Sequence, residues 1–191
     1  MANIILASQS PRRRELLEKM GIRDFTVRVP DAEEVLKEGL SPQQTVEDIS
    51  LQKSEAAAAL AGEDDIVITA DTMVFLDGQK LGKPRDEEDA LRMLTALAGR
   101  SHEVCTGVTV RRGGQIETFS VTTLVTFREA SERELRNYIA SGEPMDKAGS
   151  YGVQGLGCLL VERIEGDYYN VMGLPVERLG RVLTHFGVEL L

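Results

Sequence analysis

The chain has 191 residues, and 42% of them are hydrophobic, which is enough to build a core in one domain or in two closely packed lobes. Its 31 acidic residues against 22 basic ones give a formal net charge of -9. This balance argues against a general nucleic-acid binder, because such a protein needs a broad basic surface. A small polyanionic ligand needs only a local cluster of positive charge and is compatible with this composition.

Several further classes are excluded by simple patterns. No apolar run approaches the roughly 20 residues that span a bilayer, and the first residues lack the basic and apolar stretches of a secretory signal. Cys105 and Cys158 are too few for a disulfide framework and lack zinc-site spacing, so we expect both to be buried thiols in strands. We therefore expect a cytoplasmic protein that binds neither membrane nor nucleic acid.

The chain order of capping residues, turns and apolar runs predicts a mixed α/β domain over residues 1–191, whose two lobes the sequence does not separate. Gly-containing turns at 77–78 and 113–114 indicate hairpins. Strands are expected over 3–7, 66–76, 104–112, 115–127 and 158–164. Helices are expected over 11–20, 42–61, 87–98, 131–140 and 175–186, with Ser10 and Ser131 as N-caps of the first and fourth.

An arginine run breaks the local rules of the first helix. Arg12, Arg13 and Arg14 occupy its first turn, where the helix dipole disfavours cations. A phosphate bound there by free N–H groups, the hydroxyls of Ser8 and Ser10 and the guanidinium groups would remove the conflict. The alternative is a solvated basic turn.

Two charged residues interrupt apolar patterns further along the chain. Lys53 falls on the apolar stripe of the second helix, where it either extends to solvent or points into a cleft and meets an anion. Asp71 interrupts a central-strand pattern, and a buried carboxylate needs a partner or a cation. Asp71 therefore lies at a strand end facing a site, binds a cation, or occupies a bulge or turn. Its neighbour Thr72 can donate a hydrogen bond to a ligand.

Three other stretches carry candidate side chains. Lys83 precedes a proline that favours extended backbone. Glu33 and Glu34 lie between the first two helices, and near a triphosphate one of them could hold a divalent cation instead of being solvated. The Gly-rich segment 142–157 offers a charged pair, Tyr151 as a stacking ring and Gln154 as an amide for a base edge, unless it is a flexible surface loop.

Taken together, these motifs resemble the Maf family of nucleotide pyrophosphatases. The resemblance runs nearly the whole length of the chain. Its matching stretches are 6–13, 52–53, 70–72, 81–84, 99–102, 146–155 and 172–175.

The resemblance implies hydrolysis of a nucleoside triphosphate to the monophosphate and pyrophosphate with Mg²⁺ or Mn²⁺. The form of residues 146–154 is similar to the branch that acts on dTTP and UTP. The resemblance also implies a mixed, strongly twisted sheet flanked by helices, in two lobes with a central cleft as in inosine triphosphate pyrophosphatases, and a homodimer.

Residue roles follow from the matched motifs. Asp71 matches the family's proton acceptor, and base and metal-ligand roles for Asp71 stay open, with Glu34 assisting. Water would attack the α-phosphorus and pyrophosphate would leave. Ser8, Arg13, Lys53 and Lys83 would neutralise the triphosphate, whereas Arg12, Thr72 and Gln154 match the specificity positions.

Two alternatives belong to other classes. A non-catalytic nucleotide sensor, or a regulator of cell division and septum formation, could keep the same cleft without releasing pyrophosphate. A P-loop enzyme is disfavoured because the chain lacks a Gly-x-x-x-x-Gly-Lys-Ser/Thr motif. A Ser-His-Asp or Cys-His mechanism lacks support from either histidine.

Overall fold

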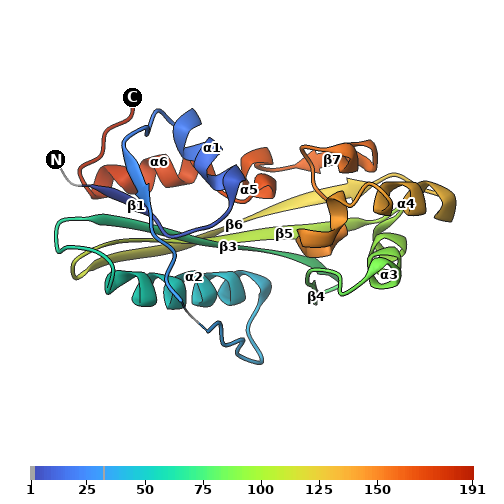
Figure 1. The fold of residues 1–191 in the computed structure, drawn as a ribbon, viewed down its shortest axis with the longest axis horizontal. Helices are drawn as coiled ribbons and strands as arrows, with labels where there is room; N and C mark the ends of the chain where they lie inside the picture. Colours follow the sequence, from blue (N-terminus) through green and yellow to red (C-terminus); the bar gives the residue numbers. More distant parts are fainter. Residues whose placement is uncertain (1–2, 32) are drawn as a thin grey trace. The chain divides into compact units, whose positions relative to one another are not determined.

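The computed structural model describes residues 3–31 and 33–191, which form a mixed α/β fold (Figure 1). Seven described strands make one sheet in the order β2-β1-β3-β5-β6-β7, with β4 paired to β3. β1 runs parallel to β2 and β3, whereas the β3–β4 and β6–β7 pairs are antiparallel. The expected mixed sheet is therefore confirmed. The strands are β1 (Ile4–Leu6), β2 (Phe25–Val27), β3 (Ile66–Leu76), β4 (Gln79–Leu81), β5 (Ser101–Arg112), β6 (Gln115–Phe127) and β7 (Val161–Glu165).

The chain divides into two compact units, and β3, β5 and β6 each contribute residues to both. Unit 1 comprises Met1–Asp71, Thr106–Val121 and Gly173–Leu191, and unit 2 comprises Thr72–Cys105 and Thr122–Met172. No helix among the described residues is long and apolar enough to cross a membrane.

In unit 1, helices pack on both faces of the sheet. Figure 1 shows α2 (Pro42–Ala58) on one face and α1 (Pro11–Lys19) and α6 (Val176–His185) on the other. α2 begins with a capping box in which the Ser41 hydroxyl accepts from the Gln44 N–H, and it buries Val46 and Ile49 against the sheet. Burial of such aliphatic side chains contributes roughly 1.5–3 kcal/mol each, so this face fixes the position of α2.

A glycine brings α2 unusually close to β5. A Cβ on Gly107 would lie 2.7 Å from the main-chain nitrogen of Glu47, and closer still to the carbonyl of Val46. Real Cβ atoms essentially never approach heavy atoms below 3.0 Å. This close approach of helix to strand therefore depends on the missing side chain.

Unit 2 has its own core beneath α3 (Glu87–Leu97) and α4 (Glu132–Ile139). The two helices begin at side-chain caps, Asp86 for α3 and the predicted capping box of Ser131 for α4. The cluster contains Leu94, Leu97, Val125, Phe127, Leu135 and Ile139. The remaining elements are the 3-10 helices η1 (Glu143–Asp146), η2 (Ala148–Ser150) and η3 (Leu156–Leu159), and the short helix α5 (Tyr168–Met172).

Some local expectations were wrong. The strand expected over 158–164 is present as β7, but it begins at Val161 instead of residue 158, because η3 extends to Leu159. The N–H groups of Leu156 and Gly157 donate hydrogen bonds to the carboxylate of Glu143, and these bonds hold the segment before β7 in turns. Cys158 is consequently exposed, although Cys105 is buried as expected. Ser10 occupies the N-cap position of α1 but makes no capping hydrogen bond with its side chain.

Candidate functional site

Several of the predicted site residues meet just past the carboxyl end of β1, beside the middle of the parallel strand β3. β1 pairs with β3 from Ile4–Ile66 to Leu6–Ile68. Ser8 follows β1 by two residues, and Asp71 lies three residues beyond the last paired residue of β3. Asp71 therefore lies inside β3, which continues to Leu76, and not at a strand end as one of the expectations had it. The place beyond the carboxyl end of a parallel strand, here β1, is where open α/β sheets bind ligands.

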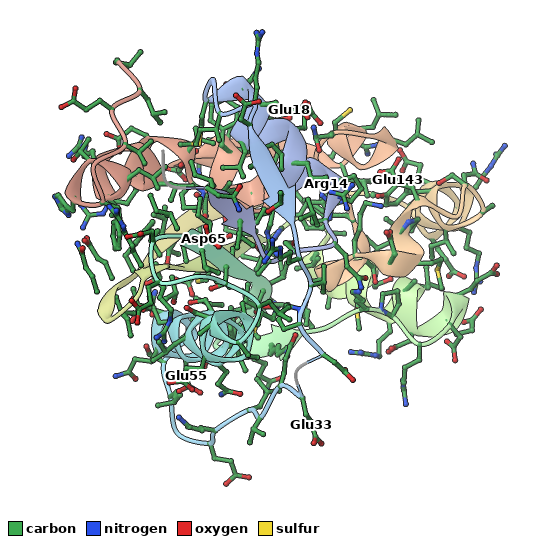
Figure 2. The ribbon with its side chains drawn as sticks, turned by 60° about the vertical axis from the view of Figure 1, so that its left-hand side comes forward. Arg14, Glu18, Glu33, Glu55, Asp65 and Glu143 are labelled. Carbon is green, nitrogen blue, oxygen red and sulfur yellow. The ribbon has the colours of Figure 1, made fainter. Side chains whose placement is uncertain are left out.

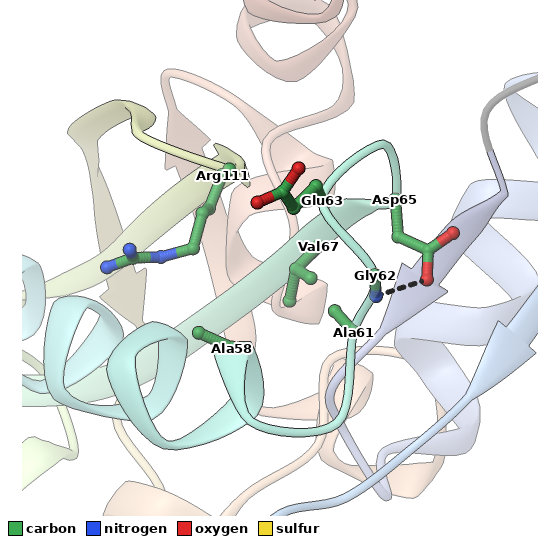
Figure 3. Close-up of a pocket in the computed structure, with 8 residues that line it drawn as sticks. Ala58, Ala61, Gly62, Glu63, Asp65, Val67 and Arg111 are labelled. Carbon is green, nitrogen blue, oxygen red and sulfur yellow. Dashed lines mark hydrogen bonds between the residues drawn. The ribbon is translucent and has the colours of Figure 1, made fainter.

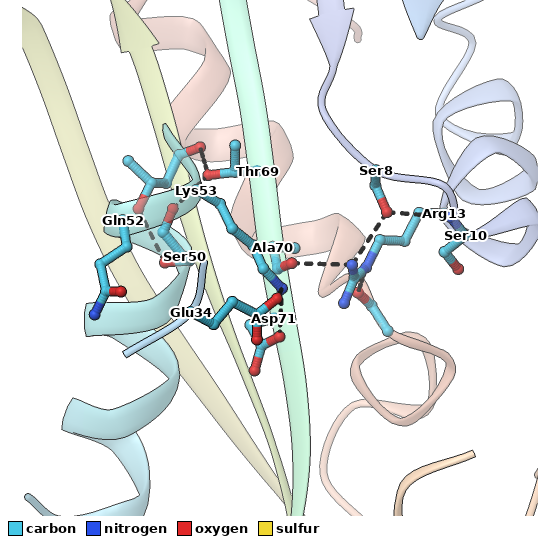
Figure 4. Close-up of polar contacts among 12 residues, drawn as sticks. Ser8, Ser10, Arg13, Glu34, Ser50, Gln52, Lys53, Thr69, Ala70 and Asp71 are labelled. Atoms are coloured by element: carbon cyan, nitrogen blue, oxygen red, sulfur yellow. Dashed lines mark hydrogen bonds and ion pairs between the residues drawn. The ribbon is translucent and has the colours of Figure 1, made fainter. Parts of the chain in front are cut away.

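Arg13 connects this place to two other segments (Figure 4). Its Nε donates to the carbonyl of Gly173 at 2.8 Å, and its Nη1 donates to the carbonyl of Ala70 at 2.9 Å and to the Ser8 hydroxyl at 3.2 Å. Burial lowers the pKa of Arg13, although the nearby Asp71 carboxylate acts in the opposite direction. Arg13 thus holds main-chain segments together and also places positive charge past the end of β1.

Lys53 lies between two carboxylates. Its Nζ is 2.6 Å from Asp71 Oδ1 and 3.0 Å from Glu34 Oε1. The Lys53 and Asp71 side chains are only 19% and 13% exposed, whereas Glu34 is 46% exposed. Lys53 therefore turns toward the chain's own carboxylates rather than extending to solvent. The other oxygen of Asp71, Oδ2, is buried and has no hydrogen-bond partner among the described residues.

Hydroxyl groups fix α2 beside β3 and β5 at the level of Lys53. The Thr69 hydroxyl donates to the carbonyl of Ser50 at 2.7 Å, and the hydroxyls of Ser50 and Thr109 are 2.9 Å apart. All three side chains are buried. Buried polar groups that satisfy one another specify a single arrangement, so these contacts set the place from which Lys53 extends.

Gln52 is a site residue to which the sequence reasoning gave no role. Its side-chain amide makes two hydrogen bonds with the main chain of Val35, accepting from N–H at 3.0 Å and donating to the carbonyl at 2.9 Å. Val35 follows Glu34, so this pair of bonds holds Glu34 beside Lys53. The only sequence signal for Gln52 was that it precedes Lys53 in the stretch 52–53, one of those that resemble the Maf family.

Residues 3–186 match the family model described as Maf-like protein. The chain belongs to the Maf family. Three similar proteins are each named dTTP/UTP pyrophosphatase. The protein from Bacillus velezensis is 48% identical over 97% of each chain, and that from Bacillus pumilus is 45% identical over 98% of each. That from Bacillus cereus is 47% identical over 100% of this chain and 98% of its own.

A solved structure supports the fold. A HAM1 protein from Coxiella burnetii matches with a TM-score of 0.54, covering 97% of this chain and 100% of that chain. The two sequences are 16% identical. This likeness therefore concerns the arrangement of helices and strands alone.

The remaining predicted residues of this Maf-family chain lie as follows. Arg12 belongs to unit 1 and is partly buried. Thr72, Lys83 and Gln154 belong to unit 2, where Thr72 is partly buried and the other two are exposed. In unit 1, the acidic side chains of Glu18, Glu33 and Glu55 are exposed (Figure 2), so part of the acidic excess is solvated.

The predicted stacking ring is not available to a ligand. Tyr151 is buried in unit 2, where its ring meets Phe127 edge to face at a centroid distance of 4.7 Å. Its hydroxyl lies 2.8 Å from Nε2 of the buried His102. Tyr151 therefore serves the core, because its apolar ring and single polar group are both satisfied there.

The two carboxylates fit a hard divalent cation. No group of three or more His, Cys, Asp or Glu side chains capable of holding a metal occurs in the described part of the chain. Mg²⁺, however, is commonly held by one or two carboxylates together with substrate phosphates. Asp71 and Glu34 provide such a pair, and the buried Oδ2 of Asp71, which has no partner among the described residues, is an oxygen with free acceptor capacity.

A separate hollow lies near the end of α2 (Figure 3). It has a volume of about 130 Å³ and lies next to a turn in which Asp65 accepts from the N–H of Gly62. Its described lining contains none of the predicted site residues, and its volume is small for a nucleotide. The lining residues are Ala58, Ala61, Gly62, Glu63, Asp65, Val67, Arg111 and Gly113.

Proposed function

We propose that this chain hydrolyses dTTP and UTP to the corresponding monophosphate and pyrophosphate. Family membership over residues 3–186 and relatives of 45–48% identity, each named dTTP/UTP pyrophosphatase, support this activity. The observation that carries it within the structure is the Lys53–Asp71–Glu34 arrangement, in which a lysine meets a buried carboxylate past the end of β1, and one oxygen of that carboxylate has no partner among the described residues.

The carboxylates would act on water. Asp71 would hold or deprotonate the water that attacks the α-phosphorus, because its Oδ2 is an acceptor without a partner among the described residues. Lys53 Nζ already binds Oδ1, which orients the carboxylate and leaves Oδ2 for this role. Glu34, placed by Gln52, would assist.

Asp71 and Glu34 would also hold a Mg²⁺ or Mn²⁺ ion. Such an ion, when bound, supplies positive charge that neutralises phosphate oxygens. Hydrolysis of a phosphoanhydride depends chiefly on positioning and charge neutralisation, so the lysine and arginine side chains of the site would contribute alongside the metal ion.

Substrate contacts are assigned from the family resemblance. Ser8, Arg13, Lys53 and Lys83 would neutralise the triphosphate, and Arg12, Thr72 and Gln154 would select the pyrimidine. Arg13 would do this with a guanidinium group that also holds the carbonyls of Ala70 and Gly173. The proposal also includes a homodimer, which rests on the family resemblance and is tested by analytical ultracentrifugation. It includes a cytoplasmic location as well, which rests on the sequence patterns.

Release of pyrophosphate from a panel of nucleoside triphosphates, with Mg²⁺, with Mn²⁺ and with chelator, tests the activity. We expect turnover of dTTP and UTP above that of purine nucleotides, and loss of turnover in chelator. Asp65→Asn is a matched control for Asp71→Asn, since Asp65 lies in the same unit and serves only the turn at Gly62 in the contacts described here. Tight nucleotide binding without pyrophosphate release would instead indicate the non-catalytic sensor.

A further inference from the structure

The Gly-rich segment of unit 2 is fixed by two side chains of its own unit. The hydroxyl of Tyr138, on α4, accepts from the N–H of Gly152 at 3.0 Å and donates to Glu143 Oε1 at 2.8 Å. Glu143 in turn accepts from the N–H of Leu156 at 2.7 Å through Oε2, and from that of Gly157 at 3.1 Å through Oε1. The Tyr138–Glu143 pair therefore binds both ends of the segment 152–157.

The glycines of this segment make room for that pair. A Cβ on Gly157 would lie 2.6 Å from the Tyr138 hydroxyl. A Cβ on Gly155 would lie 2.7 Å from Glu143 Oε1 and nearer still to Oε2. The sequence suggested that glycines here admit a ligand, but at these two positions the space is filled by the unit's own carboxylate and phenol.

The carboxylate of Glu143 is also tuned by this environment. Burial opposes its ionisation, but hydrogen bonds from Gly157, Tyr138 and Leu156 outweigh burial, so the pKa of Glu143 is lowered. An ionised carboxylate accepts from all three donors at once, whereas an amide of the same shape has only one accepting oxygen.

Gln154 lies in the middle of the held segment. Gln154 is exposed. On one side it is preceded by the buried Val153, and on the other it is followed by Gly155, whose main chain lies against the carboxylate of Glu143. An exposed side chain on a main chain anchored on both sides projects from a fixed position, and such positioning is what hydrogen-bond recognition of a base edge requires.

We propose that Glu143, together with Tyr138, is a positioning residue that sets the pyrimidine selectivity of the enzyme by fixing the main chain around Gln154. This inference rests on the proposed function. Uracil presents an acceptor where cytosine presents an amino donor, so a displaced amide loses discrimination between UTP and CTP before it loses the reaction.

The test compares Glu143→Gln and Tyr138→Phe with Glu134→Gln. Glu134 is a matched control because it is a carboxylate of the same unit that accepts from the Ser131 N–H in the capping box of α4 and is not bonded to the segment 152–157 in the contacts described here. Each variant is assayed for kcat and KM with UTP and with CTP. Amide hydrogen exchange is measured at Leu156 and Gly157.

Glu143→Gln and Tyr138→Phe should lower the UTP-over-CTP ratio of kcat/KM by about tenfold, the effect of one well-placed hydrogen bond. The loss should appear mainly in KM for UTP, and exchange at the two amides should accelerate. Glu134→Gln should keep the wild-type ratio.

Three results distinguish the outcomes. An unchanged ratio in folded Glu143→Gln or Tyr138→Phe, or an equal fall in Glu134→Gln, would overturn the positioning role. Wild-type protein that does not release pyrophosphate from UTP would overturn the proposed function itself. If Glu143→Gln does not fold, Tyr138→Phe decides the positioning role, because it keeps the aromatic ring and removes only the hydroxyl.

Discussion

Gly107→Ala tests how the helix that carries Lys53 is held against the sheet. The new Cβ would stand 2.7 Å from the nitrogen of Glu47 and nearer to the carbonyl of Val46. Both are main-chain atoms of α2, so no rotation of a side chain can relieve the overlap and the helix itself has to move. Lys53 lies seven residues beyond Val46, or about 10 Å further along the helix axis.

The cost follows from this geometry. Adding a methyl group to a filled site typically costs 1–3 kcal/mol, and rigid main-chain neighbours place this site near the upper value, about 3 kcal/mol. For a chain of this size the melting temperature should fall by roughly 6–12 °C. A displacement of about 1 Å at Lys53 should also lower kcat for UTP, by up to about 100-fold.

Thermal unfolding and pyrophosphate release together measure both effects. Gly114→Ala, at the β5–β6 turn, is the control, because a Cβ there would meet no atom of the described residues within 4 Å. That variant should keep the wild-type melting temperature and kcat. If Gly107→Ala behaves like Gly114→Ala, the reasoning from the close approach of α2 to β5 is refuted.

Three further predictions concern single side chains. Asp71→Asn keeps the shape but not the charge, so UTP turnover should be abolished while calorimetry still detects nucleotide binding; near-native turnover would remove Asp71 from its proposed role. In Arg13→Lys, a single ammonium group cannot reach the carbonyls of Ala70 and Gly173 and the Ser8 hydroxyl together. The free energy of unfolding in urea should therefore fall by about 3 kcal/mol, and an unchanged midpoint would contradict the bonding described. Burial lowers the pKa of His102 to about 4, so the unfolded chain binds a proton more readily than the folded one. The contribution of neutral His102 to the free energy of unfolding is therefore complete above pH 6.5, and about 3 kcal/mol should be lost as the pH falls from there through 4. Urea unfolding at pH 7 and pH 4.5 measures this difference in the free energy of unfolding. If the same difference persists in His102→Gln, it arises from other titrating groups.

The long elements could be predicted because their signals are local. The capping box at Ser131 and the hairpin at Gly113 act within a few residues, and both occur where expected. β2 and α5 could not be predicted, because three or five residues carry too little periodicity and such elements form only by pairing or packing with distant segments.

The candidate site shows the same division. A lysine on an apolar stripe and a carboxylate in a strand can be recognised in the sequence, and the structure brings Lys53 and Asp71 together. The bonds of Arg13 to the carbonyls of Ala70 and Gly173 could not be predicted, because every residue has a carbonyl and only the folded chain selects which ones meet. The same holds for Gln52, whose partner is the main chain of Val35.

The Tyr138–Glu143 pair has a consequence for exchanging sequence between Maf-family proteins. A graft limited to residues 152–157 would transfer a glycine pattern whose spacing suits one particular phenol and carboxylate. In a recipient lacking that pair, the N–H groups of the grafted segment would have no acceptor and its glycines would have nothing to accommodate. The smallest unit to transfer in redesigning nucleotide preference is therefore residues 138–157, which carries Gln154, the proposed specificity residue, together with its support.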